Sequence, residues 1–257
     1  MTVYEDAHIE IKSSSELDIM RASGCILDEI LEELSCHAKP GVTTWDLEMM
    51  ARRLFKERRV DAAFLGYKDY PAALCTSINE EVVHGIPSPH RVLKKGDLLK
   101  IDAGLYRNGF YVDEARTVAV GTVDEESRRL MDVAREALLC GIDKAQAGNR
   151  LGDISHAIQE AVESHGYNVV REYTGHGIGR RLHESPQIPN FGSPNSGPRL
   201  KPGMVLALEP MVNAGCWETK VLEDQWTVVT ADGCRSTHFE HTVAIREHGL
   251  EILTQQG

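Results

Sequence analysis

The sequence predicts an α+β fold built from two related halves, in each of which helices precede antiparallel strands. Apolar residues recur at steps of three and four through the first sixty residues, as in amphipathic helices. After Lys95-Gly96 the apolar period changes to two, which is typical of strands. The same plan then returns at a fixed offset along the chain, which indicates a duplication.

Two helices are expected before the first strands. In the first, apolar residues from position 17 to position 34 follow helical spacing, and Lys39-Pro40-Gly41 ends it because proline cannot continue a helix. The second helix begins at Thr44, whose hydroxyl can cap the free backbone N–H groups. Its apolar face comprises Leu47, Met50, Ala51, Leu54 and Phe55.

A hairpin is expected next, with strands over residues 98–102 and 109–120 separated by Asn108-Gly109, a pair that favours a two-residue turn. In such a turn the numbers of opposed residues sum to 217, so Asp102 lies opposite Ala115. Asp113 then points to the same face as Asp102, as a diagonal neighbour about 7 Å away. Two converging carboxylates repel unless one is protonated or a cation lies between them, so the pair indicates a metal site. A pair of solvated strand acids is the alternative.

The duplication is visible in two blocks. Residues 93–102 align with residues 200–209 at an offset of 209 − 102 = 107, and Pro40-Gly41 matches Ala147-Gly148 at the same offset. Chance similarity of two Lys-x-Gly turns explains one block, but the shared offset favours a repeat. We therefore expect a single domain over residues 1–257, with halves at roughly 10–122 and 123–250.

The second half contributes two further acids. Glu209 is the repeat counterpart of Asp102, and Glu240 lies on an alternating strand as Asp113 does. If the halves pack about a pseudo-twofold axis, the four carboxylates meet in apolar strand surroundings where unpaired charge is costly. Such a group requires more than one divalent ion.

Two histidines follow a glycine-rich pattern. His176 lies in the run TGHGIG, whose small residues let the backbone approach a ligand closely, and His183 follows seven residues later. A phosphate-binding loop is disfavoured because no Gly-Lys-Ser/Thr is present and the chain is acidic.

Charge and composition exclude several functions. The 28 Lys and Arg against 39 Asp and Glu give a net charge of −11, which argues against nucleic acid and anionic membranes as partners. The longest apolar run, residues 204–208, is far shorter than the roughly 20 residues that cross a bilayer. Residues 1–6 resemble no targeting signal, so a cytoplasmic location is expected. The six cysteines form no Cys-x-x-Cys pair and are expected to be reduced.

The acids and His176 together resemble the metal-binding set of a known family. Their spacings of 11, 63, 33 and 31 residues are similar to those of the methionine aminopeptidases, which have the duplicated pita-bread fold with a curved antiparallel sheet and outer helices. The chain is most similar to the bacterial type I enzymes, since no zinc-binding N-terminal extension and no long insertion between His176 and Glu209 is present. The matching motifs are NEEVVHGIP (79–87), IDAG (101–104), GHGIG (175–179), HE (183–184), LEPM (208–211) and FEHT (239–242).

This resemblance implies a dinuclear metal centre. Asp113 and Glu240 would bridge two divalent ions, Asp102 would complete one site, and His176 with Glu209 would complete the other. An oxygen-rich set with one imidazole suits Mn, Fe(II), Co or Zn.

The resemblance also implies the reaction and the partners. Metal-activated water would attack the first peptide bond and release an N-terminal methionine that precedes a small residue. Glu209 would shuttle the proton, His183 would stabilise the oxyanion, and His84 would contact the scissile amide. The substrates would be peptide and nascent-protein N-termini, met near the ribosomal exit tunnel by a monomeric enzyme. The methionine side chain would enter an apolar cup formed by Phe64, Tyr67, Tyr70, Cys75, Leu182 and Trp226.

Two alternatives remain, one another peptidase of the same fold and one of a different class. An Xaa-Pro peptidase of the same fold usually carries a large extra N-terminal domain and a different sequence after the position of Glu209. A metal-free binding module would keep the fold and lack the ligands, and all five ligands are present in this chain.

Overall fold

The computed structural model describes residues 9–255 and confirms the predicted α+β class. Residues 1–6, which resemble no targeting signal in sequence, lie outside the described residues. The helices are α1 (Ser14–His37), α2 (Thr44–Glu57), the short 3-10 helix η1 (Tyr67–Asp69), α3 (Glu125–Lys144) and α4 (Leu151–Glu163). The strands are β1 (Asp61–Ala62), β2 (Cys75–Ile78), β3 (Glu81–Val83), β4 (Leu98–Arg107), β5 (Phe110–Ala119), β6 (Asn168–Val169), β7 (Thr174–Gly177), β8 (Glu184–Pro189), β9 (Val205–Leu208), β10 (Met211–Asn213), β11 (Thr219–Val221), β12 (Val228–Thr230), β13 (Ser236–His238), β14 (Glu240–Ile245) and β15 (Leu250–Ile252).

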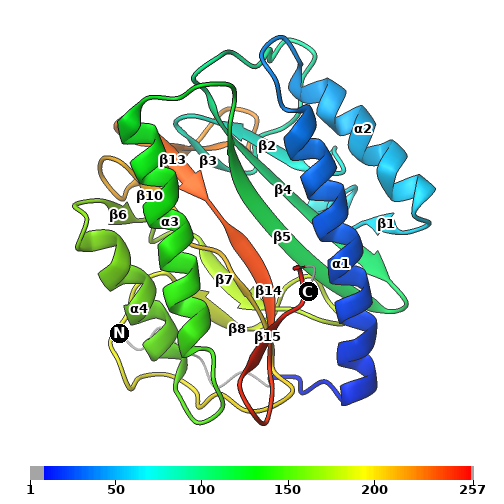
Figure 1. Cartoon of the computed structure of the whole chain (residues 1–257), viewed down its shortest axis with the longest axis vertical. Coiled ribbons are helices and arrows are strands. Elements are labelled where there is room, and N and C mark those ends of the chain that lie inside the picture. Colours follow the sequence, from blue (N-terminus) through cyan, green and yellow to red (C-terminus); the bar gives the residue numbers. More distant parts are fainter. Residues whose placement is uncertain (1–8, 256–257) are drawn as a thin grey trace.

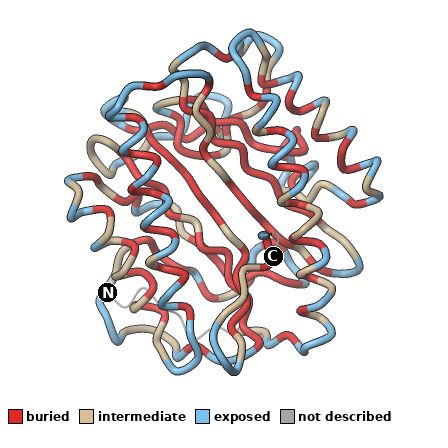
Figure 2. Tube along the Cα trace, in the orientation of Figure 1, coloured by how far each residue is buried: buried red, intermediate tan, exposed pale blue. Residues whose placement is uncertain are grey.

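The main sheet runs through both halves in the order β1-β4-β5-β14-β9-β7-β8, with β2 paired to β4 and β15 to β14. Its strand pairs are antiparallel. Helices α1 and α3 lie over one face of this sheet, with α2 and α4 beyond them (Figure 1). The strands between the helices are almost continuously buried, whereas the helices alternate between buried and exposed residues (Figure 2).

Side-chain caps fix where the first two helices begin. The backbone N–H of Ser13 donates to the Glu16 carboxylate at 2.7 Å, which completes a capping box before α1. The cap of α2 is Thr43, and the prediction of Thr44 was wrong by one residue. Thr43 has an extended backbone and accepts the N–H of Asp46 at 3.1 Å, whereas Thr44 is already the first helical residue.

The β4–β5 hairpin has the predicted register. Asn108 and Gly109 both have positive φ, as a two-residue primed turn requires, and Asp102 pairs with Ala115. The first strand is longer than predicted, because the tight turn keeps the ladder paired as far as Arg107 opposite Phe110.

Equivalent contacts recur in the two halves at the predicted offset. The N–H of Gly41 donates to the Leu93 carbonyl at 2.9 Å, and the N–H of Gly148 donates to the Leu200 carbonyl at 3.0 Å. Both glycines have positive φ, +94° and +98°, which favours glycine. Each half therefore enters its second helix from the same turn, held by the same hydrogen bond.

The pairing of β5 with β14 joins the halves. Glu240 lies opposite Ala115 and His241 opposite Glu114. Glu114 faces the helices, because its carboxylate binds Arg116, which in turn binds Asp28 of α1. Strand alternation then directs the neighbouring Asp113 to the other face of the sheet.

Two further predictions concern the whole described chain. Across residues 9–255 no helix combines the length and the apolar character that a membrane crossing needs. All six cysteines are free thiols, as predicted.

Candidate metal centre

One cavity, on the face of the sheet opposite α1 and α3, gathers the residues singled out in the sequence. Lys68, at the short helix η1, also lines it and was not anticipated. The complete lining is Phe64, Tyr67, Lys68, Tyr70, Cys75, His84, Asp102, Asp113, His176, Leu182, His183, Glu209, Trp226 and Glu240.

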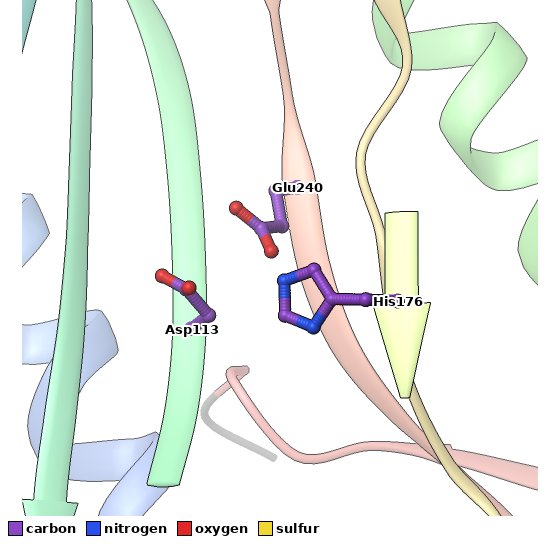
Figure 3. A group of neighbouring side chains, drawn as sticks. All are labelled: Asp113, His176 and Glu240. Carbon is purple, nitrogen blue, oxygen red and sulfur yellow. The ribbon is translucent and has the colours of Figure 1, made fainter. Parts of the chain in front are cut away.

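Three side chains from three strands point toward one another in this cavity. Asp113 of β5, His176 of β7 and Glu240 of β14 each offer one ligand atom, and these atoms lie within 4.8 Å of one another (Figure 3). A reciprocal pair of hydrogen bonds joins Asp113 of β5 to Thr242 of β14. The Asp113 N–H donates to Thr242 Oγ1 at 2.9 Å, and that hydroxyl donates to the Asp113 carbonyl at 2.8 Å. The two halves are thus locked together at the centre of the site.

Glu209, which follows β9, lies beside this group. Its Oε1 is 3.6 Å from His176 Nε2, and its Oε2 is 3.7 Å from His238 Nε2. His238 was missed in the sequence. Its signal was its position two residues before Glu240, because alternate residues of an extended chain share a face.

Several polar atoms of the cluster lack a hydrogen-bond partner among the described residues. They are Asp102 Oδ1, Glu240 Oε1 and both ring nitrogens of His238. Buried polar atoms without a partner are costly and are normally satisfied. Oxygen atoms left free in a buried group of acids are the donors that divalent cations require, so the residues fit the predicted metal centre.

Burial shifts the ionisation of the acids in one direction. It raises the pKa of Asp102 to about 7. Burial, together with repulsion from the neighbouring carboxylates, raises the pKa of Asp113, Glu209 and Glu240 well above the usual value. A bound cation stabilises the ionised carboxylates and reverses this shift, because opposite charge favours the charged form.

His176 is prepared to act as a ligand. Its Nδ1 lies 2.8 Å from the Gly177 carbonyl, which can only accept, so Nδ1 carries the proton and Nε2 presents a lone pair. Burial lowers the pKa of His176 to about 3, which keeps the ring neutral. A neutral ring with Nε2 facing the acids is the form that binds metal.

Two further histidines flank the acids. The ring centroid of His183 lies 4.3 Å from that of His176, and Tyr67 Oη lies 2.9 Å from His183 Nδ1. His84 has a positive φ of 61° and meets the Trp226 ring edge-on at 6.2 Å. Burial lowers the pKa of both His84 and His183 to about 4, so both rings are neutral at pH 7.

Apart from Lys68, the remaining lining residues form a mainly apolar compartment beside the acids. Tyr70 packs against Trp226 with ring centroids 5.0 Å apart, and its hydroxyl donates to backbone carbonyls instead of facing the cavity. Cys75 pairs with Asp102 across β2 and β4, which places both side chains on one face. Burial raises the pKa of the Cys75 thiol well above its usual value, so it stays uncharged.

The site combines a buried cluster of acids from both halves with a neutral imidazole and an apolar compartment. This combination is typical of a metal-dependent peptidase. Residues 18–247 match the profile of the family described as "Metallopeptidase family M24", and the chain belongs to this family.

Within that family the similarity is to methionine aminopeptidases. The chain is 52% identical over 246 residues to the "Methionine aminopeptidase" of Clostridium acetobutylicum, covering 96% of this chain and 98% of that protein. It is 51% identical over 244 residues to "Methionine aminopeptidase 1" of Bacillus subtilis, covering 95% and 98%. The crystal structure of methionine aminopeptidase from Thermotoga maritima superposes with a TM-score of 0.95 at 49% identity, covering 97% and 100%.

The Xaa-Pro alternative shares only the fold. The Xaa-Pro dipeptidase of Bacillus anthracis is 23% identical, with a TM-score of 0.75, and this chain covers 62% of it. That coverage agrees with the expectation that such enzymes carry additional chain.

Proposed function

We propose that this protein removes the N-terminal methionine from peptides and nascent proteins whose second residue is small, by metal-dependent hydrolysis. The observation that carries the proposal is the convergence of Asp113, His176 and Glu240 beside a compartment lined mainly by apolar and aromatic side chains. The names of relatives that are about half identical over nearly the whole chain support the same activity.

We propose that two divalent ions occupy the centre. Four carboxylates line one cavity, and two divalent cations balance four negative charges. Asp113 and Glu240 are proposed to be shared by both ions, Asp102 to complete one site, and His176 with Glu209 the other. The mixture of carboxylates with one imidazole suits Mn, Fe(II), Co or Zn, and the bound metal supplies Lewis acidity and an activated water.

The chain's own groups would move the proton and stabilise developing charge. Glu209, whose Oε1 lies 3.6 Å from His176 Nε2, is proposed to take a proton from the attacking water and pass it to the leaving amine. With the Tyr67 hydroxyl as the donor to His183 Nδ1, Nε2–H of His183 would be free to donate to the carbonyl oxygen as it becomes negative. His84 is proposed to contact the scissile amide.

The compartment would select methionine by shape and polarity. Phe64, Tyr70, Cys75 and Leu182 are buried, with Tyr67 and Trp226 partly exposed at the cavity. Burial of a thioether side chain there contributes about 1.5–3 kcal/mol, and sulfur packs favourably against aromatic rings. An unbranched, flexible side chain would fit such a compartment better than a charged one.

The cellular setting is part of the proposal. We propose a monomer that works in the cytoplasm on nascent chains near the ribosomal exit tunnel. Free cysteines are typical of a reducing compartment and support the location. Sedimentation of the protein alone tests whether it is a monomer. Sedimentation with translating ribosomes tests whether it binds them.

A peptide assay tests the activity. The chelator-treated protein is assayed on Met-Ala-Ser and Ala-Pro-Ser peptides after addition of Mn, Fe(II), Co or Zn. Release of methionine from the first peptide only, dependent on metal, is expected. Release of alanine from the second indicates an Xaa-Pro peptidase, and absence of both metal binding and release indicates the binding module.

A further inference from the structure

A buried ion pair links the segment before α1 to the turn that carries His183. The ammonium of Lys12 binds the carboxylate of Glu184, and the two side chains are only 3% and 1% exposed. Lysine and glutamate are rarely buried to this extent, and desolvating both charges is costly. The pair therefore needs an explanation beyond general stability.

Glu184 closes the turn between β7 and β8. Its second carboxylate oxygen accepts the N–H of Arg181 at 3.0 Å, so one carboxylate spans residues 181–184. Glu184 is also the residue that pairs with Gly177, where the β7–β8 register shifts next to His176. Glu184 thus holds the chain at Arg181, through its carboxylate, and at Gly177, through the strand pairing. His183 is the residue directly before Glu184 in this turn.

The N-terminal segment is fitted closely to this turn and to β9. The N–H of Lys12 donates to the Gly203 carbonyl at 2.8 Å, just before the strand that leads to Glu209. A Cβ at Gly179 would lie 2.2 Å from Lys12 Cε, so a side chain there would displace the lysine from its ion pair. At Gly203 a Cβ would lie 2.6 Å from Ile11 Cγ2.

We propose that residues 9–13 form an N-terminal strap, and that Lys12 is a positioning residue that fixes His183 through Glu184. The strap holds the turn so that the His183 ring stays against Tyr67 and His176. A donor to a developing oxyanion must be placed within a few tenths of an ångström, and a 1 Å displacement costs on the order of 100-fold in rate. The catalytic part of this inference rests on the proposed function.

The first test is a double-mutant cycle between Lys12 and His183. Lys12→Met should lower kcat about 10-fold, with KM within about twofold and an unchanged metal content. Lys12→Arg should restore most of kcat. In a His183→Ala background, Lys12→Met should change kcat less than about twofold. An equal loss in both backgrounds, or no loss in a folded Lys12→Met protein, would overturn the proposal.

Two controls separate positioning from stability. Arg53→Gln removes an exposed ion pair with Glu57 within α2 and should leave kcat unchanged. If Lys12→Met unfolds, the paired Lys12→Met/Glu184→Gln variant removes both charges without leaving one buried alone, and it should show the same loss of kcat.

NMR spectra of the histidine rings test, independently of catalysis, whether the strap positions His183. In protein with isotope-labelled histidine, Lys12→Met should shift the ring signals of His183, assigned by their loss in His183→Ala, and leave those of the half-buried His156 on α4 in place. Unchanged His183 signals in the folded variant contradict the strap. An inactive wild-type protein would refute the proposed function alone, and the spectra would still decide the strap.

Discussion

Asp113 and Glu240 come from different halves of the chain, yet their ligand atoms lie within 4.8 Å of each other. The cause is the pairing of β5 with β14, which sets Glu240 opposite Ala115, two residues from Asp113. A cation bound by both carboxylates would therefore hold the two halves together as well as serve the reaction.

Removing a shared ligand should empty the whole centre. In Asp113→Asn, both ions of the proposed centre would lose a carboxylate that they share, so the metal content of the purified protein should fall from two ions to less than one. Elemental analysis after dialysis measures this. Asp124→Asn, at an exposed helix cap far from the cavity, should keep both ions. Two tightly bound ions in Asp113→Asn would show that Asp113 does not bridge.

Divalent metal should stabilise the fold. Binding at 100 times the Kd adds about 2.7 kcal/mol to the free energy of unfolding, and a chain of this size gains about 2–4 °C per kcal/mol. A thermal scan of chelator-treated protein with added Mn or Co should thus show a Tm higher by roughly 5–10 °C. Glu240→Gln should abolish the shift. An equal shift in that variant would mean that the metal binds elsewhere.

Asp102 should make the metal-free protein sensitive to pH. Burial raises the pKa of Asp102 to about 7, above its unfolded value of 3.8, so its contribution to stability is present below pH 4 and is lost as the pH rises through 7. Relative to wild type, metal-free Asp102→Asn should gain about 2–4 kcal/mol at pH 8 and almost nothing at pH 4. Urea unfolding at both pH values measures the difference. A gain that is the same at both would contradict burial as the cause.

His183→Ala should separate turnover from metal binding. We expect the loss of the proposed oxyanion donor to lower kcat by about 10²–10³, while the proposed ligands among the carboxylates and His176 remain to hold the ions. Steady-state kinetics on Met-Ala-Ser and metal analysis of the same sample provide both values. His156→Ala, at a half-buried histidine of α4 outside the cavity lining, is the matched control. Normal turnover in His183→Ala would remove this residue from the mechanism.

Local rules predicted the part of the site that depends on a tight turn. Asn108-Gly109 fixes the hairpin register, so the positions of Asp102 and Asp113 followed from arithmetic alone. The 107-residue offset then indicated Glu209. The same reasoning overlooked His238, although its spacing from Glu240 placed it on the correct face.

Contacts between distant segments were beyond local rules. The apolar compartment joins Phe64 to Leu182 and Trp226, and only resemblance to a family suggested that grouping. The pair of Lys12 with Glu184 spans 172 residues, and no periodicity or motif in either segment points to the other. Lys68 lines the cavity because it lies in a turn where its φ is positive, and the sequence did not indicate this turn.

The most direct measurement is an anomalous difference map of crystals grown with Mn, recorded at the manganese absorption edge. Two peaks are predicted, both bound by Asp113 and Glu240, one also reached by Asp102 and the other by His176 and Glu209. A map without peaks between these side chains, from protein that releases methionine in the same buffer, would contradict a centre assembled from both halves.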